Sequence, residues 1–249
     1  MRNLIKDERL LEVLKVFKEK LGYDIDAEPV RQDPVVFLAS ISKQNEKYIC
    51  HYEVSKQIPH YAWFHELMHV CLDIESGIDY YAYSKKVAHI TGVRHINALL
   101  AGMFSHRTIW ERGEKYGFSE KEHWNNVINN LIQKIHRNPD WGKSVVHQEL
   151  LISYRALLTA DSILSYAHDE AKQDLIRIAE IHQPQALALA QEVCQHCTTV
   201  DLFSPEGFDD LPKKLLRIMR LPQEILVPVP RGTPDPDFFL KQIVPILQG

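Results

Sequence analysis

The sequence predicts an α+β fold that is predominantly α-helical, with a small β-sheet near the N-terminus. Residues 35–39 and 48–54 are short runs rich in β-branched, aromatic and other apolar residues, which is typical of strands. Most of the remaining chain places apolar residues three or four positions apart, which is typical of helices. The 249 residues are 45% hydrophobic and 25% charged, an ordinary composition for a globular protein.

The first half of the chain is expected to alternate helices with the strand pair. Glycines and one proline set the expected limits, because glycine commonly follows the end of a helix and proline is tolerated at its start. The expected elements are a helix over 4–21 ended by Gly22, strands at 35–39 and 48–54 bridged by a polar turn, a helix over about 59–73 opened near Pro59, a loop over 74–85, and a helix over about 86–112 that stops near Gly113.

The second half is expected to be helical throughout. Ser119 and Glu122 form a capping box, the side-chain pair that often opens a helix. The expected elements are a helix from this box to about 137, a long amphipathic stretch over 143–182, a helix from Pro184 through Cys197, and short helices near 211–220 and 236–247 within a proline-punctuated tail.

Charge and hydropathy narrow the class of partner. The formal net charge of −4 shows no excess of basic residues of the kind that binds nucleic acid. The N-terminal residues lack the apolar core of a signal peptide, and no apolar run approaches membrane-spanning length. We therefore expect a cytoplasmic protein that binds neither nucleic acid nor membrane, whose oligomeric state the sequence leaves open.

Residues 65–69, His-Glu-Leu-Met-His, carry the most specific chemical signal in the chain. Histidines at i and i+4 stand on one face of a helix, about 5–6 Å apart at Cβ, which suits two nitrogens on one zinc ion. Glu66 lies a step round the helix, so it can reach a water on the metal without competing for the metal. The pattern predicts one zinc ion on His65 and His69, with Glu66 as a general base.

The residues around this motif favour the same interpretation. From Ala62 to Leu72 every residue outside the three motif positions is uncharged, and most are apolar. A helix that is apolar nearly all round is buried, and buried histidine and glutamate need a charged or hydrogen-bonding partner. A metal ion would supply that partner.

A catalytic zinc keeps three protein ligands, so a third must be found. Glu75 has the spacing used by the metzincin class, but that class needs glycine at a tight turn where this chain has Leu72, so Glu75 is rejected. His106 continues an apolar stripe on the following helix and is the preferred candidate. The stripe consists of Ile96, Leu99, Met103, His106 and Trp110, and the remaining candidates are His89, His95 and Glu111.

Over roughly residues 35–117 the chain resembles gluzincin-type metallopeptidases of the ImmA/IrrE class. The resemblance is carried by the His65–His69 motif, a following loop, Asn97–Leu100, Ser105–Arg107 and Gly113. In that class the third ligand comes from a helix after the motif and is often acidic, whereas here a histidine is best placed and the Glu-x-x-x-Asn run is lacking. The resemblance implies a zincin-like core with a small sheet beside the motif helix, and a strand edge that pairs with extended substrate, here residues 35–41 or 47–54.

The predicted function is zinc-dependent hydrolysis of a peptide bond in a peptide or protein substrate. Two alternatives stay open: an inactive zincin-fold binding or regulatory module, and a zinc hydrolase of a small non-peptide amide. The donor for the oxyanion is left open among Tyr80, Tyr81, Tyr83 and His147. Three regions are expected: a zincin-like metal-binding domain over 1–117, a helical region over 118–200, and a tail over 201–249.

Cys194 and Cys197 form a lone Cys-x-x-Cys pair, and the other cysteines are Cys50 and Cys71. Such a pair can belong to a structural zinc site or a redox centre, but no βαβ pattern surrounds it. We favour reduced, chemically inert cysteines.

Overall fold

The computed structural model describes residues 1–30, 38–54, 57–199, 210–230 and 233–249. The chain forms two compact units, each assembled from separate stretches of sequence. The first comprises Met1–Gly77, Thr108–Glu120 and Gly232–Gly249, and the second comprises Ile78–Arg107 and Lys121–Arg231. The three sequence regions 1–117, 118–200 and 201–249 stay a prediction about how the chain divides.

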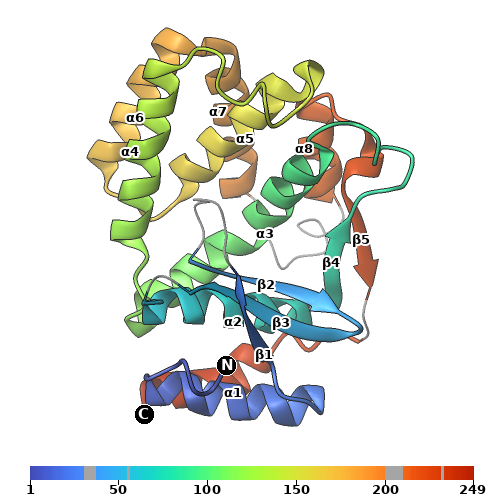
Figure 1. Cartoon of the computed structure of the whole chain (residues 1–249), viewed down its shortest axis with the longest axis vertical. Helices are drawn as coiled ribbons and strands as arrows, with labels where there is room; N and C mark the ends of the chain where they lie inside the picture. The colour runs from blue at the N-terminus through green and yellow to red at the C-terminus, as the bar shows by residue number, and fades with distance from the viewer. Residues whose placement is uncertain (31–37, 55–56, 200–209, 231–232) are drawn as a thin grey trace. The chain divides into compact units, whose positions relative to one another are not determined.

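The first unit contains a mixed three-stranded sheet in the order β1-β3-β2. Its strands are β1 (Asp26–Val30), β2 (Ala39–Gln44) and β3 (Lys47–Glu53). β3 lies in the centre, parallel to β1 and antiparallel to β2, and Figure 1 shows all three crossing beside α2. The β2–β3 turn uses Asn45 and Glu46 at φ of 49° and 65°, the left-handed pair that suits a two-residue hairpin.

The strand expectations are confirmed only in part. The run at 48–54 forms β3, but β3 is paired on both sides, so the expectation that 47–54 supplies a free edge is wrong. Of the strand expected at 35–39, residues 35–37 lie outside the described residues, and β2 begins at Ala39. β1 was not expected, because Asp26, Glu28 and Pro29 interrupt the apolar alternation by which strands are recognised.

Helix α1 (Glu8–Leu21) confirms the first expected helix with a later start. The Asp7 side chain accepts hydrogen bonds from the backbone N–H groups of Arg9 and Leu10, which fixes the N-terminus there rather than at residue 4. Gly22 ends it at φ 78°.

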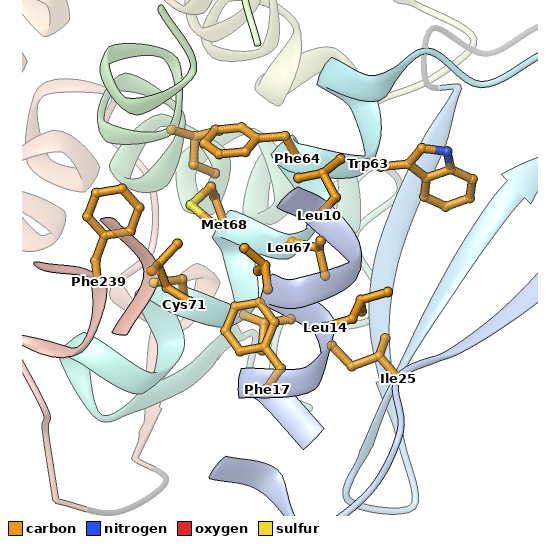
Figure 2. Close-up of a cluster of buried hydrophobic side chains, with 14 of the residues drawn as sticks. Leu10, Leu14, Phe17, Ile25, Trp63, Phe64, Leu67, Met68, Cys71 and Phe239 are labelled. Carbon is orange, nitrogen blue, oxygen red and sulfur yellow. The ribbon is translucent and has the colours of Figure 1, made fainter. Parts of the chain in front are cut away.

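Helix α2 (His60–Ser76) carries the His65–His69 motif and forms the centre of the first unit. Its apolar side chains pack against α1 and the C-terminal segment, and Figure 2 shows Leu67 and Cys71 of α2 close to Leu14 and Phe17 of α1. The C-terminal segment consists of the π-helical turn η4 (Phe239–Ile243) and α9 (Val244–Gln248), near the helix expected over 236–247. The motif therefore lies on a helix whose backbone is held by a continuous core.

The second unit is almost entirely helical. Its elements are β4 (Ile78–Ala82), the N-terminal part of α3 (Val93–Tyr116), α4 (Lys121–Arg137), η1 (Gln148–Leu150), α5 (Leu151–Leu164), α6 (Asp169–His182), α7 (Pro184–Thr199), α8 (Leu211–Ile218), η3 (Gln223–Ile225) and β5 (Val227–Pro230). The helices expected at 119–137, 184–197 and 211–220 are confirmed. The α+β, predominantly helical class is confirmed as well.

Three expectations in this unit were wrong in detail. The expected loop 74–85 contains the end of α2 and strand β4, which pairs antiparallel with β5 from far along the chain. The helix expected over 86–112 begins at Val93 and continues through Gly113 to Tyr116. The stretch 143–182 is divided into α5 and α6, because Ser165 adopts an extended backbone that ends α5. Among the described residues, no helix is long and apolar enough to cross a membrane.

Candidate metal centre

The exposure pattern of α2 separates its two histidines from everything around them. From Ala62 to Leu72 every residue is buried except His65 and His69, which are half-buried. Because the two positions are four apart, both imidazoles leave the helix on one side. Between Ala62 and Leu72, the two histidines therefore form the one partly exposed face of a helix that is otherwise buried.

The two imidazoles approach each other through their Nε2 atoms, which lie 3.2 Å apart. The rings meet edge to face, with centroids 4.9 Å apart. Two nitrogens bound to one tetrahedral zinc at the usual Zn–N length are about 3.3 Å apart. The observed spacing therefore suits two ligands of one ion.

His106 lies on α3 in the second compact unit, whereas His65 and His69 lie in the first. Gly102 gives the His106 ring its space, since a Cβ at Gly102 would lie 2.9 Å from its Cε1 atom. His106 as the third ligand, and metal binding itself, stay predictions.

The other candidates for a third ligand lie elsewhere. His89, His95 and Glu111 are exposed. Glu75 is buried near the end of α2 and makes a two-pronged ion pair with Arg112, at 2.8 Å and 3.0 Å. Burial raises the pKa of Glu75 more than Arg112 lowers it.

Glu66 is buried, with 6% of its surface exposed, on the turn of α2 between the two histidines. Burial raises the pKa of the Cys50 thiol on β3, and the negative charge of Glu66 adds to that rise. The carboxylate therefore acts electrostatically on the central strand of the sheet. Its position beside His65 is the one that the motif requires of a base.

Two carboxylates that the sequence analysis missed contact the histidines. Glu120, just before α4, places Oε1 2.6 Å from Nδ1 of His65. Asp161, on α5, places Oδ1 3.5 Å from Nδ1 of His106. Both carboxylates are buried. Each lies 55 residues from its histidine in the sequence, so no local spacing could have identified it.

The four candidates for an oxyanion donor have different surroundings. The side chains of Tyr80 and Tyr81 lie outside the described residues. Tyr83 packs against the core of the second unit. The exposed His147 accepts a hydrogen bond from the backbone N–H of Glu149 at the start of η1. None of these observations assigns a donor.

Cys194 and Cys197 lie on α7 within the second unit. Burial is the main cause that raises the pKa of each thiol to about 12, so both stay protonated at neutral pH. Cys194 also donates a weak hydrogen bond to the carbonyl oxygen of Ala160. These surroundings agree with inert structural cysteines, because only a thiolate binds metal or attacks a disulfide.

The chain was also compared with known proteins. No protein-family model, no curated protein and no solved structure matches it.

Proposed function

We propose that this protein is a zinc-dependent metallopeptidase of gluzincin type, similar to the ImmA/IrrE class. The observation that carries the proposal is the pair of His65 and His69 on α2, whose Nε2 atoms lie 3.2 Å apart next to the buried Glu66, and His106 is the proposed third ligand. Three neutral imidazoles are a donor set that zinc accepts, and such a set leaves a fourth position for water or substrate. The residues present therefore fit the ion.

Each residue has a distinct proposed role. His65, His69 and His106 would hold one zinc ion. A zinc ion held there supplies a Lewis acid and lowers the pKa of a bound water to about 7. Glu66 would accept a proton from the attacking water on its carboxylate and pass it to the leaving amine.

The sheet of the first unit suits an extended substrate. β2 packs against α2, and it lies at one edge of the described sheet. An edge strand can pair with an added strand through main-chain hydrogen bonds, without requiring a particular side-chain sequence. Residues 39–44 would therefore align a peptide beside the motif helix.

The proposal is tested with zinc-loaded protein and a broad peptide library read by mass spectrometry. We expect cleavage by the wild type. Glu66→Gln should bind zinc normally and cleave about 10²–10⁴ times more slowly, the usual contribution of a positioned acid–base group. Glu114→Gln, an exposed change on α3, is the matched control and should cleave at the wild-type rate.

Two results would contradict the proposal. A Glu66→Gln variant with wild-type turnover would remove Glu66 as the base. A zinc-loaded wild type that cleaves nothing in the library, yet retains a peptide in pull-down, would make the protein a binding module.

A further inference from the structure

We infer that Glu120 is a positioning residue for the zinc site, acting through His65, and that Asp161 has the same role for His106 with a smaller effect. The inference rests on the proposed zinc site and adds residues that the His65–His69 motif does not contain. It starts from the two histidine–carboxylate contacts, each of which lies within a single compact unit.

The Glu120–His65 contact fixes which nitrogen of His65 is available. When Glu120 is ionised it only accepts hydrogen bonds, and the proton of this contact is then on Nδ1 of His65. The Oε1–Nδ1 distance of 2.6 Å is at the short end for a hydrogen bond between nitrogen and oxygen. In the neutral ring this leaves the lone pair on Nε2, the atom that faces His69 at 3.2 Å.

Burial makes this contact strong. The side chain of Glu120 is 6% exposed and that of His65 is 12% exposed, so water competes little for either group. Glu120 also comes from outside α2, at the residue before α4. The contact therefore restrains rotation of the His65 ring from a second part of the backbone, which the motif helix alone does not do.

The Asp161–His106 contact has the same chemistry but a looser geometry. Its carboxylate is also buried, with 10% side-chain exposure, and comes from α5. The Oδ1–Nδ1 distance of 3.5 Å is at the upper limit for a hydrogen bond. Gly102 adds a second restraint on this ring, because a side chain there would push the imidazole away. Asp161 should therefore contribute less than Glu120.

The chain also supplies a histidine–carboxylate pair away from the site. Glu122 lies two residues after Glu120, and its Oε1 is 3.3 Å from Nε2 of His168. Its side chain is 83% exposed and that of His168 is 44% exposed. Glu122→Ala thus removes the same kind of contact, in nearly the same stretch of chain, without touching the proposed ligands.

The test is the zinc affinity of the full-length protein, measured by competition with a chromophoric chelator. Glu120→Ala should weaken zinc binding by roughly 10–100-fold, the usual cost of losing such a partner of a ligating histidine. Glu120→Gln should recover part of this loss, because the amide oxygen still accepts from Nδ1. Asp161→Ala should lose less than Glu120→Ala, and Glu122→Ala should bind as the wild type. Thermal unfolding of each metal-free variant checks that the fold is retained.

The outcomes separate the positioning role from the zinc site itself. If the wild type binds zinc and Glu120→Ala binds it equally well, the positioning role is wrong while the proposed site stands. If Glu120→Gln loses as much as Glu120→Ala, the effect is not carried by the hydrogen bond, and the positioning role is again wrong. If the wild type takes up no zinc, both proposals fail. An unfolded Glu120→Ala leaves the decision to Glu120→Gln, which must weaken zinc binding for the inference to stand.

Discussion

Two helices of this chain carry residue pairs at metal-ligand spacing, and they differ in their surroundings. On α2, His65 and His69 are the half-buried positions of a buried stretch, and their Nε2 atoms face each other. On α7, burial is the main cause that raises the pKa of the Cys194 and Cys197 thiols to about 12. Ligand spacing along a helix therefore does not by itself make a metal site, because the pair also needs a third ligand and polar partners.

The largest expected effect is on the α2 pair. Replacing both His65 and His69 by alanine should reduce bound zinc from one equivalent to none, measured by elemental analysis of protein purified without added metal. The matched control is His136→Ala with His182→Ala, an exposed histidine pair whose ring centroids lie 5.4 Å apart. A full equivalent of zinc in the α2 double variant would show that His65 and His69 do not bind the metal. The contrast in metal binding between α2 and α7 would then be wrong.

Next in size is the loss of the third proposed ligand. His106→Ala should weaken zinc binding by more than the roughly 10–100-fold that loss of an outer partner costs, because a direct ligand is removed. His95→Ala is the control, since His95 is exposed on the same helix. Unchanged affinity in His106→Ala would show that α2 gains no ligand from α3.

A third effect concerns the stability of the C-terminal end of α2, where Glu75 lies. Arg112 pairs with the buried Glu75, and its guanidinium lies 3.7 Å from the centre of the Phe239 ring. Arg112→Met should lower the free energy of unfolding by about 3–5 kcal/mol, because Glu75 would be left as an uncompensated buried charge. Arg177→Ala, which breaks an exposed pair with Asp174 on α6, should change it by less than about 1 kcal/mol.

Arg112→Met should also change how the free energy of unfolding depends on pH. Burial already raises the pKa of Glu75 in the folded protein above its ordinary 4.5. A raised carboxyl pKa means that the folded state holds its proton more tightly, so stability declines as the pH rises from about 4.5 through the folded pKa. Without Arg112 that pKa rises further, and urea unfolding should show a deficit that widens with increasing pH. A deficit that is constant between acid and neutral pH would contradict this.

The smallest expected effect is on α7. Cys194→Ser with Cys197→Ser should leave zinc content unchanged. In the native wild type both thiols should react with a thiol reagent far more slowly than in unfolded protein, because the reactive thiolate is scarce near about pH 8. A second zinc equivalent that is lost on thiol modification would make α7 a site as well.

The elements that the sequence predicted are those with a local signal. α1, α2 and α7 follow from apolar spacing and from residues at their ends, such as Gly22, Pro59 and Pro184. His65, Glu66 and His69 follow from a five-residue pattern. His106 was selected from an apolar stripe on one helix, and its role as the third ligand stays a prediction.

The features that the sequence missed depend on distant partners. β4 lies in a run that reads as a loop, and it becomes a strand only because β5, with its two prolines, pairs with it. Glu120 has no apolar or ligand spacing to His65, and only the fold brings the two together. Such contacts depend on how the whole chain packs, and patterns within a single sequence do not reveal that packing.

The most direct test of the account is the zinc K-edge X-ray absorption spectrum of the wild type, purified without added metal. We predict one zinc ion whose nearest neighbours are nitrogen and oxygen at about 2.0–2.1 Å, with the outer-shell scattering of three imidazoles and no sulfur. A sulfur shell at about 2.3 Å would place the metal on cysteine instead and contradict the account. A zinc-free protein that takes up no zinc on titration would contradict it as well.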